Sequence, residues 1–327
     1  MPYGKTGIQN LGNTCFINSI IQCLSHTVGL TKYLITEEYK KNNIKNENDF
    51  ILEYHNVLRS LWGNNHNVID ILELKKLICK YSRDSIDFRG NNQCDADEFL
   101  GFFLDTIHNQ SSYSKIFTIT GDIKSINDEI ITKSYQQYIT EFEKNYSKIV
   151  ELFYGQYHSI LIFPEFEYQS IKFDSFNKLI LPISDIDSNN IYDYINYDLS
   201  RLEELSDIVC DKNNKYTTAS KKLSLWKLPK ILIITFKRFQ NDGKKISKLI
   251  EFPIDNLDLN EYCIDKREKN NNYSLYGVVN HYGGCNSGHY TAICKNNGSW
   301  LEFNDSGVSE NNDIVTNAAY ILFYKKI

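Results

Sequence analysis

Proline and glycine are scarce in this chain of 327 residues, with five and sixteen copies. So low a content excludes a collagen-like or low-complexity disordered chain. The longest strongly apolar run covers 231–236, whereas a membrane-spanning helix needs about 20 apolar residues. Residues 1–7 contain no apolar core of the kind found in a secretory signal. The sequence therefore predicts a soluble intracellular protein without a membrane anchor, in the cytoplasm or nucleus or, if viral, in the host cell.

An excess of positive charge is also missing, because 36 Lys and Arg residues stand against 41 Asp and Glu residues, for a net charge of −5. Nucleic-acid binding normally uses a basic face. The longest basic cluster, Lys221-Lys222 through Lys227 and Lys230, is interrupted by apolar residues. We interpret it as strand ends and a solvated loop, and we expect no nucleic-acid partner.

Paired cysteines at metal-binding spacing are absent, because the eight cysteines are scattered. They are Cys15, Cys23, Cys79, Cys94, Cys210, Cys263, Cys285 and Cys294. Scattered thiols without a secretory signal indicate free cysteines in a reducing compartment. Free cysteines are usually buried, and we interpret Cys23, Cys79 and Cys94 as buried structural residues.

The first part of the chain carries apolar residues at helical spacing. This pattern predicts helices over 18–24, 50–62, 70–81 and 95–108, and one long charged helix over 128–152. The second half is rich in β-branched and aromatic residues, which predict strands. Those strands are expected at 157–163, 167–173, 178–182, 230–238, 273–280, 290–295, 300–304 and 319–325.

No internal repeat or long linker divides the chain; Asn-, Asp- and Lys-rich loops at 185–190, 211–215 and 266–272 separate the predicted strands. We therefore expect an α+β fold in a single catalytic unit. A helical lobe comes first, and a mostly antiparallel β lobe follows.

A candidate nucleophile stands where a polar turn, 10–14, leads directly into an apolar helix. Cys15 occupies the first turn of this helix, with Asn13 or Thr14 as its N-cap. The positive end of a helix lowers the pKa of a thiol, and its free N–H groups can hold an oxyanion. A buried structural role is the alternative for Cys15, as for most free cysteines.

A candidate base, His289, precedes the predicted strand 290–295, and Asn296-Asn297-Gly298 predicts a hairpin to the next strand. Three loop choices place His289 opposite Asn304, Asp305 or Ser306, and the sequence does not select among them. Each brings a carboxamide or carboxylate near the imidazole, as a Cys–His pair requires.

Glycines make the segment before His289 slim enough for close approach of a substrate backbone. They are Gly283, Gly284 and Gly288. A Gly-rich surface hairpin with a histidine at its edge is the alternative interpretation. His281 suits a structural or substrate-lining role better than a catalytic one.

Six elements, in order along nearly the whole chain, resemble the ubiquitin-specific protease family of papain-like cysteine deubiquitinases. Residues 7–22, GIQNLGNTCFINSIIQ, are similar to its cysteine box, GLxNLGNTCxxNSxxQ, with Ile8 as a departure. Residues 93–100 resemble its QQDAxEFL element, with Cys94 replacing the second Gln. The others are 281–290 (HxGxxxxGHY), 300–308 (WxxF[ND]DSxV), 228–239 (LPxxLxxxLKRF) and 147–159, the start of the fingers.

This resemblance implies a papain-like α+β fold in one catalytic domain over 1–327. The implied lobes are a helical thumb at about 1–150, β fingers at about 151–230 and an antiparallel β palm at about 231–327. The implied activity is that of a thiol-dependent deubiquitinase, which hydrolyses the isopeptide or peptide bond after the terminal glycine of ubiquitin. Ubiquitin and ubiquitinated proteins are the implied partners of a monomer that needs no cofactor.

The resemblance also implies roles for individual residues. Cys15 is the expected nucleophile, His289 the base and Asn304 the third member of the triad. Asp305 follows Asn304 and is expected to assist, and Asn10 matches the family's oxyanion-hole donor. An amide nitrogen suits that task because it donates to developing negative charge.

Residues expected to contact ubiquitin's tail follow from the same elements. Asp95 and Glu98 match positions that contact the tail, whose arginines precede a Gly-Gly end, and three-residue spacing places both carboxylates on one helix face. A solvated face is the alternative for this pair. His281, Gly288 and Tyr290 are expected to line the tail cleft.

The chain departs from the family at the zinc site that the fingers often carry. The first expected Cys pair is replaced by apolar residues at 160–164. Cys210 matches the second pair, but Asn213 occupies its partner's position. A closed zinc site needs four ligands, so we expect no metal and apolar packing in its place.

Three alternative functions remain open at this point. The first is a catalytically silent ubiquitin-binding module on the same fold. The second is the same protease acting on a ubiquitin-like modifier. The third is a general papain-like peptidase that cuts unrelated peptides.

Overall fold

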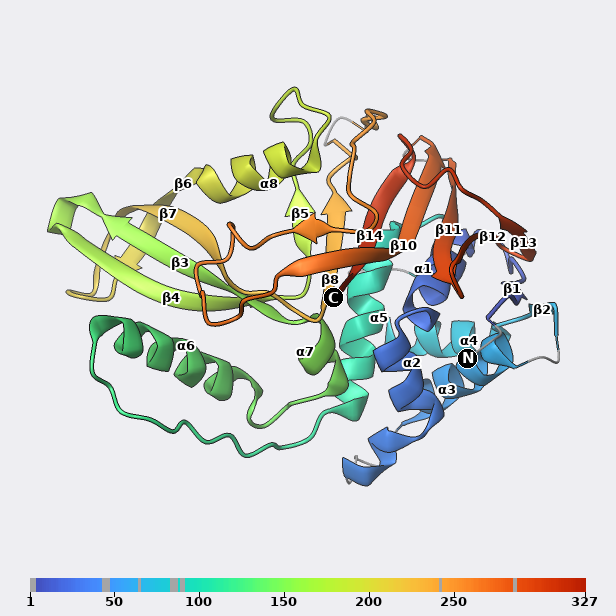
Figure 1. Cartoon of the computed structure of the whole chain (residues 1–327), viewed down its shortest axis with the longest axis horizontal. Helices are drawn as coiled ribbons and strands as arrows, with labels where there is room; N and C mark the ends of the chain where they lie inside the picture. The colour runs from blue at the N-terminus through green and yellow to red at the C-terminus, as the bar shows by residue number, and fades with distance from the viewer. Residues whose placement is uncertain are drawn as a thin grey trace.

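The computed structural model describes residues 4–42, 48–63, 66–82, 88, 92–240, 243–284 and 287–327. Helices from the first part of the chain form one lobe, a large sheet lies against them, and a smaller sheet extends away to one side (Figure 1). The fold is therefore α+β, as predicted. None of the helices in the described ranges combines the length and hydropathy needed to cross a membrane.

The helical lobe follows the predicted periodicity. Its elements are β1 (Gly7–Ile8), α1 (Cys15–Ser25), α2 (Val28–Ile35), η1 (Glu38–Asn42), α3 (Asp49–Trp62), β2 (Val68–Ile69), α4 (Leu72–Tyr81) and α5 (Ala96–Ser111). The four helices predicted here are confirmed, while the short α2 was not predicted. Aromatic rings join α5 to its neighbours: Phe99 meets Phe16 edge-on at 5.4 Å between centroids, and Phe103 meets Tyr54 at 4.8 Å.

A sheet of eight strands forms the second layer. Its strands are β5 (Leu179–Leu181), β8 (Ile231–Phe236), β9 (Leu257–Asp258), β10 (Asn272–Gly283), β11 (Gly288–Asn296), β12 (Ser299–Asn304), β13 (Gly307–Glu310) and β14 (Ala319–Lys326). The order is β13-β12-β11-β10-β14-β8-β5, with β9 beside β10. Every pair is antiparallel except β5 with β8.

Both faces of the large sheet are buried, because successive side chains of a strand point to opposite faces. In β8, Ile231 and Ile233 belong to the core shared with the helical lobe. Leu232 and Ile234 belong to a second core on the opposite face. Helix α8 (Ile191–Ser200) supplies Tyr194 to this second core. The two cores fix the sheet, and with it the edge that carries His289.

The smaller sheet contains β3 (Gly155–Phe163), β4 (Tyr168–Phe176), β6 (Leu202–Cys210) and β7 (Lys215–Lys227), in the order β4-β3-β7-β6, with η2 (Pro164–Phe166) between β3 and β4. The sequence did not predict β6 or β7. β6 is largely exposed and β7 has exposed, partly buried and buried residues without regular alternation, so neither shows the pattern that marks a half-buried strand. The interpretation of the basic cluster as strand ends and a loop is wrong for Lys221 and Lys222, which pair with β3 in the ladder.

The single helix predicted over 128–152 is wrong, because two helices occur there: α6 (Ile126–Phe142) and α7 (Lys148–Phe153). Ser147 leaves the helical region at φ −151° and accepts a hydrogen bond from the Val150 N–H, which starts α7. The break lets Tyr146 pair with Tyr113 through two backbone hydrogen bonds of 2.9 Å. Figure 1 shows α6 running beneath the small sheet.

The cysteines only partly match their prediction. The seven that lie in the described ranges are free thiols, and Cys285 lies outside those ranges. Cys23 is fully buried, as predicted. Cys79 and Cys94 are partly exposed, so the prediction of burial is wrong for them. Cys79 lies near the end of α4 and Cys94 in the segment before α5, where less of the protein covers them.

Candidate active site

The thiol of Cys15 lies at the N-terminus of α1, where the sequence placed it. Thr14 is the N-cap, and the turn before it needs positive φ at Gly12 (95°) and Asn13 (52°). Cys15 is buried and accepts a hydrogen bond from the backbone N–H of Tyr290 on β11. Since Tyr290 directly follows His289, helix α1 and strand β11 bring the thiol and the imidazole segment together.

The pKa of the Cys15 thiol is raised, contrary to the expectation that the helix N-terminus lowers it. Burial is the largest cause, because it disfavours the charged thiolate. The Asp305 carboxylate also raises the pKa, whereas the N–H groups of Tyr290 and Phe16 oppose the rise. Protein dipoles therefore stabilise the thiolate only in part, and a nearby base has to take the proton.

His289 meets Asn304, with 2.7 Å between Nε2 and the Asn304 Oδ1. A carboxamide oxygen only accepts hydrogen bonds, so Nε2 carries the proton and Nδ1 is left as a proton acceptor. The hairpin turns at Asn297 (φ 48°) and Gly298 (φ 91°), which selects the third of the predicted registers. The contact with Asn304 is thus diagonal across the hairpin.

Asp305 links the two ends of the site. Its carboxylate accepts hydrogen bonds from the Asn10 Nδ2 at 2.8 Å and from the Asn18 Nδ2 at 2.7 Å. Its backbone oxygen accepts the N–H of Ile8 at 2.9 Å. Asn18 is buried on α1, three residues after Cys15. Sequence reasoning missed Asn18, although the residue stands inside the cysteine box.

The carboxamide of Asn10 is held from both sides. Its oxygen accepts the N–H groups of Gly12 at 3.0 Å and Thr14 at 3.2 Å. Its nitrogen donates one hydrogen to Asp305. These contacts fix the side chain beside the N-terminus of α1, close to the backbone of Cys15.

Gly288, at the start of β11, is bound on both backbone groups by Gln93. The Gly288 N–H donates to the Gln93 Oε1 at 2.7 Å, and the Gly288 carbonyl accepts from the Gln93 Nε2. A Cβ at Gly288 would lie 2.2 Å from the His281 Nε2, so only glycine fits. Gln93 begins the motif at 93–100, but the sequence did not indicate its role. The contact with Gly288 joins residues 195 positions apart.

His281 and Tyr290 face each other across neighbouring strands, with ring centroids 4.5 Å apart. Phe239 packs on the other side of His281 at 5.2 Å. Burial lowers the pKa of His281 to about 4, so its ring is neutral at physiological pH. His281, Tyr290 and Phe239 line a small hollow of about 90 Å³ together with Gln93, Cys94 and Asp95.

The sequence predicts that Asp95 and Glu98 share one face of a helix. In the structure the two carboxylates have different surroundings. Asp95 is the N-cap of α5 and accepts the Asp97 N–H at 2.6 Å. Both its oxygens also accept the Tyr320 hydroxyl at 2.8 Å. Burial raises the pKa of Asp95, whereas Glu98 is exposed on the first turn. The next carboxylate, Asp97, pairs with Lys178 at 2.6 Å.

No cluster of three or more His, Cys, Asp or Glu side chains suited to a metal ion occurs in the ranges that the structure describes. Cys210 ends β6 fully buried, packed with Phe163 and Ala219. The Asn213 N–H donates to the Cys210 carbonyl within a turn. Apolar packing therefore surrounds Cys210 at the end of the small sheet.

A buried thiol at a helix N-terminus, bonded to the residue that follows an imidazole oriented by a carboxamide, suits a cysteine-dependent hydrolase. A family model described as ubiquitin carboxyl-terminal hydrolase matches residues 6–324. The chain belongs to this family.

Two curated relatives illustrate the likeness. Ubiquitin carboxyl-terminal hydrolase Usp2 of Drosophila melanogaster is 32% identical over 336 residues, covering 99% of this chain and 35% of the relative. Ubiquitin carboxyl-terminal hydrolase 2 of Homo sapiens is 34% identical over 345 residues, covering 98% of this chain and 55% of the relative. The chain thus spans about a third to about a half of the length of these relatives.

Solved structures agree with the fold. The SAGA DUB module of Ubp8, Sgf11, Sus1 and Sgf73 bound to monoubiquitin contains a chain that matches at a TM-score of 0.73 and 27% identity, over 100% of this chain and 70% of that one. The same module bound to ubiquitin aldehyde matches with the same values. These likenesses confirm the papain-like α+β fold with its helical thumb, β palm and β fingers.

Proposed function

We propose that this chain is a thiol-dependent deubiquitinase, which hydrolyses the isopeptide or peptide bond after the C-terminal glycine of ubiquitin. The observation that carries the proposal is the hydrogen bond from the Tyr290 N–H to Cys15, which ties helix α1 to the strand that carries His289 and its partner Asn304. Family membership supports the choice of ubiquitin over an unrelated peptide.

The first chemical step is attack of the Cys15 sulfur on the carbonyl carbon of the terminal glycine. The raised pKa of Cys15 keeps the resting thiol protonated, so Nδ1 of His289 takes the proton as the S–C bond forms. His289 then gives this proton to the leaving amine, and an acyl-enzyme thioester remains. A water that His289 deprotonates hydrolyses the thioester and restores the thiol.

The negative charge on the carbonyl oxygen is stabilised by Asn10 and by the backbone N–H of Cys15. Asn10 Nδ2 donates one hydrogen to Asp305. We assign its second hydrogen to a hydrogen bond with the oxyanion. Loss of one such donor lowers turnover by about 10²–10³-fold in comparable enzymes. Asp305 contributes by holding Asn10 in place.

The substrate tail lies along Gly288, in the hollow lined by His281 and Tyr290. Bare backbone at Gly288 suits the narrow Gly-Gly end of ubiquitin. Of the two expected carboxylates, Glu98 is exposed and available to a tail arginine. The carboxylate of Asp95 is bound to Tyr320 and caps α5, so it acts mainly by positioning this helix.

The lobes divide the remaining work. We propose a thumb over about 1–150, fingers over about 151–230 and a palm over about 231–327, forming one catalytic domain. Ubiquitin lies against the fingers while its tail reaches the thumb–palm cleft. We propose that the chain acts as an intracellular monomer on ubiquitinated proteins, without a cofactor.

A ubiquitin probe with a reactive C-terminus tests this proposal. We expect one adduct, on Cys15, together with turnover of a ubiquitin C-terminal fluorogenic amide. The Cys15→Ser variant should give neither, while Cys79→Ser serves as a matched control that keeps both. Turnover that survives in Cys15→Ser would refute the mechanism.

The same assay separates the alternative functions. Capture by a ubiquitin-like probe but not by ubiquitin would move the substrate to another modifier. Cleavage of unrelated peptides without probe capture would indicate a general peptidase. Tight ubiquitin binding without any adduct would indicate a silent binding module.

A further inference from the structure

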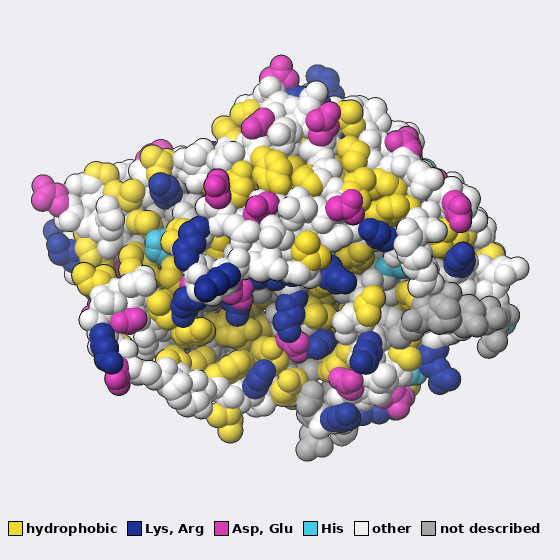
Figure 2. Space-filling view, viewed as in Figure 1, with side chains coloured by type: hydrophobic (Ala, Val, Ile, Leu, Met, Phe, Trp, Pro, Cys, Tyr) yellow, Lys and Arg dark blue, Asp and Glu magenta, His cyan; other side chains and the backbone are white. Residues whose placement is uncertain are grey.

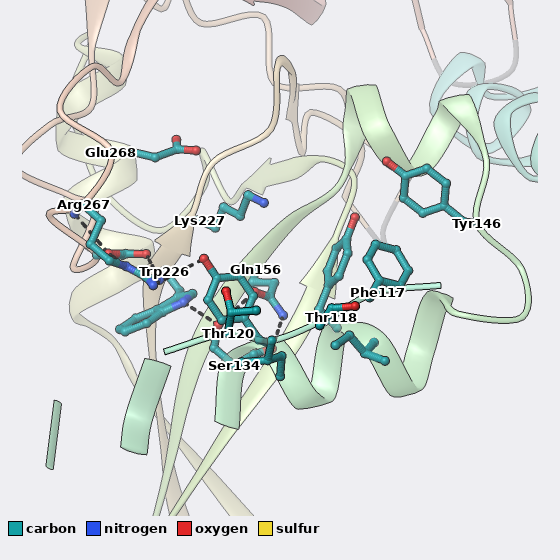
Figure 3. A pocket seen from close by; sticks show the side chains of 15 residues that line it. Phe117, Thr118, Thr120, Ser134, Tyr146, Gln156, Trp226, Lys227, Arg267 and Glu268 are labelled. Carbon is teal, nitrogen blue, oxygen red and sulfur yellow. Dashed lines mark hydrogen bonds and ion pairs between the residues drawn. The ribbon is translucent and has the colours of Figure 1, made fainter. Parts of the chain in front are cut away.

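A cavity of about 570 Å³ lies between α6, the segment 117–120 and the end of β7, and shares no lining residue with the candidate active site. We call it the α6 cavity (Figure 3). Its lining residues are Phe117, Thr118, Ile119, Thr120, Ser134, Tyr135, Tyr138, Ile139, Tyr146, Gln156, Trp226, Lys227, Asp265, Arg267 and Glu268. Its volume is in the range of sites for small organic molecules.

Aromatic rings form much of the cavity wall. Phe117 meets Tyr138 and Tyr146 edge-on, with centroids 5.9 and 5.5 Å apart. Trp226 is buried, and its indole N–H donates to the Ser134 hydroxyl at 2.8 Å. Figure 3 shows Phe117, Tyr146 and Trp226 around the cavity, and Tyr138 also lines it. A flat apolar molecule would find aromatic contacts on several sides.

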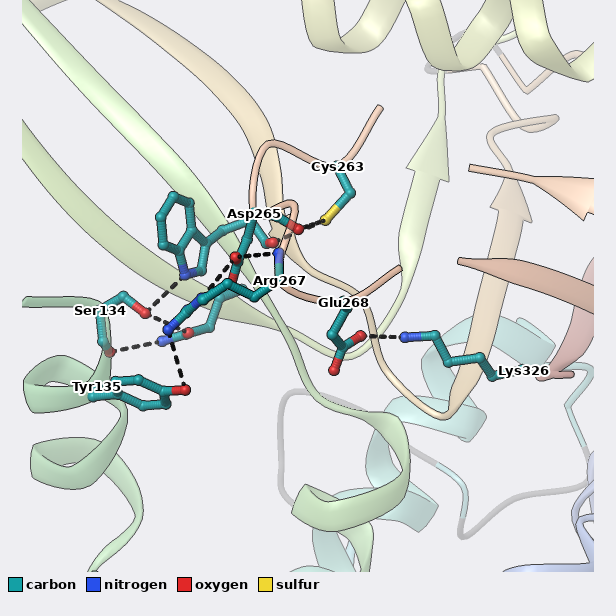
Figure 4. Close-up of polar contacts among 9 residues, drawn as sticks. Ser134, Tyr135, Cys263, Asp265, Arg267, Glu268 and Lys326 are labelled. Carbon is teal, nitrogen blue, oxygen red and sulfur yellow. Dashed lines mark hydrogen bonds and ion pairs between the residues drawn. The ribbon is translucent and has the colours of Figure 1, made fainter. Parts of the chain in front are cut away.

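The two carboxylates of the cavity are already neutralised. Asp265 accepts from Arg267 through both oxygens, at 2.8 and 2.5 Å, and the Arg267 guanidinium also lies over the Tyr135 ring. Glu268 pairs with Lys326 outside the cavity lining. Figure 4 shows both pairs, with Arg267 next to Tyr135. These contacts leave neither acid free to hold a cation.

Lys227 is the remaining charge. Its ammonium lies 5.5 Å from the centroid of the Tyr138 ring, and among the described residues no carboxylate forms an ion pair with it. Lys227 is exposed at the mouth of the cavity, yet desolvation is still the largest influence on its pKa, which is lowered. Glu268 and Asp265 act on this ammonium over a distance, each already bound to its own cation. A partly desolvated ammonium without a directly bound carboxylate gains more from a bound anion than a fully hydrated one.

The arrangement on the surface agrees with this charge balance. In Figure 2, Lys and Arg side chains lie next to hydrophobic ones in the region between α6 and the small sheet. The cavity therefore combines aromatic walls with one ammonium, Lys227, that forms no direct ion pair with a described residue.

We propose that the α6 cavity binds an aromatic monocarboxylate, with its carboxylate on the Lys227 ammonium and its ring system among Phe117, Tyr138 and Trp226. A single negative charge on the ligand matches the Lys227 ammonium. A second negative charge would be repelled by the nearby carboxylates of Asp265 and Glu268. Such a ligand contacts the segment 117–120, α6 and β7 at once, and so joins three separate segments of the chain. Binding is non-covalent, and it is independent of the function proposed for Cys15.

The test uses 2-naphthoate and its neutral counterpart 2-naphthamide, titrated into the ¹⁵N-labelled full chain. The three tryptophans, Trp62, Trp226 and Trp300, each give one indole N–H signal. We expect the Trp226 signal to shift and the other two to stay in place. The carboxylate should bind about tenfold tighter than the amide, as a charged hydrogen bond predicts.

Lys227→Met removes the cation while keeping the length of the side chain, and Lys222→Met on the same strand is the matched control. We expect the tenfold preference to fall to about one in Lys227→Met and to persist in Lys222→Met. Equal binding of acid and amide by the unaltered chain would overturn the proposal, as would a Trp226 signal that does not move. The comparison of acid with amide in the unaltered chain tests the proposal even if Lys227→Met fails to fold.

Discussion

Replacing Asp305 tests the proposed architecture most directly, because this carboxylate holds two amides from the first twenty residues. In Asp305→Ala the Asn18 amide, buried on α1, loses its acceptor at 2.7 Å. A hydrogen bond from a buried amide to a charged group contributes about 1.5–3 kcal/mol. The Asn10 contact at 2.8 Å is exposed and contributes about 0.5–1 kcal/mol. We therefore expect the free energy of unfolding to fall by about 2–4 kcal/mol.

Asp305→Asn should lie between the two. Its single carbonyl oxygen can accept from Asn10 or from Asn18 but not well from both, so about half of the loss is expected. Urea unfolding followed by tryptophan fluorescence measures both variants. Asp313→Asn, an exposed carboxylate near the same strands, is the control and should leave stability unchanged.

The reactivity of Cys15 supplies a second readout that a purely structural role would not move. The Asp305 carboxylate raises the pKa of the Cys15 thiol, so its removal should lower that pKa and increase the thiolate fraction at neutral pH. The rate of alkylation by iodoacetamide, followed against pH, should then rise at lower pH in Asp305→Asn. Turnover should nevertheless fall by roughly tenfold or more, because Asn10 loses its support. Unchanged stability together with an unchanged alkylation profile would contradict the reasoning.

Three further predictions concern single positions. Gly288→Ala places a Cβ 2.2 Å from His281 and should abolish most turnover of a ubiquitin amide; Gly284→Ala, which has open space around it, should not. His281, with its pKa lowered to about 4 by burial, binds a proton in the unfolded chain below about pH 6.5 but not in the fold. Stability should therefore decline as pH falls from about 6.5 to 4, by at most about 3 kcal/mol, and His281→Gln should flatten this decline in urea titrations at several pH values. Ser147→Ala removes a buried N-cap that also bonds His108 at 2.7 Å. It should lower stability by about 1–2 kcal/mol in thermal unfolding, more than the exposed cap variant Ser125→Ala.

The sequence predicted the helices with one buried face and the strands that are buried on both faces. Helices α3 and α4 repeat apolar residues at helical spacing, and β8 and β14 are continuous β-branched or aromatic runs. The pattern failed where burial is slight, as in β6, or does not alternate, as in β7. It also failed at Ser147, because a cap inside a helical pattern is decided by the tertiary contact of Tyr146 with Tyr113.

The site divides in a similar way. Local motifs located Cys15, His289 and Asn304, because turn, helix and hairpin signals lie close to each of them. The roles of Gln93 and Asn18 depend on partners almost two hundred or more positions away, which no local pattern contains. The sequence likewise could not show that the Asp95 carboxylate is bound by the hydroxyl of Tyr320, which lies 225 positions later. The pKa of Cys15 differed from its expectation because the depth of burial is a property of the folded whole.

Asn10 and Asp305 touch across 295 intervening steps of the chain, and this separation has a consequence during synthesis. When a ribosome has released the chain up to about residue 30, Cys15 and helix α1 have been made. His289 and Asp305, whose carboxylate holds Asn10, have not. Between the synthesis of Cys15 and that of Asp305, a growing chain therefore carries the thiol without the groups proposed to act with it. The proposed catalytic site forms only when strands β11 and β12 pack against helix α1 and the turn before it.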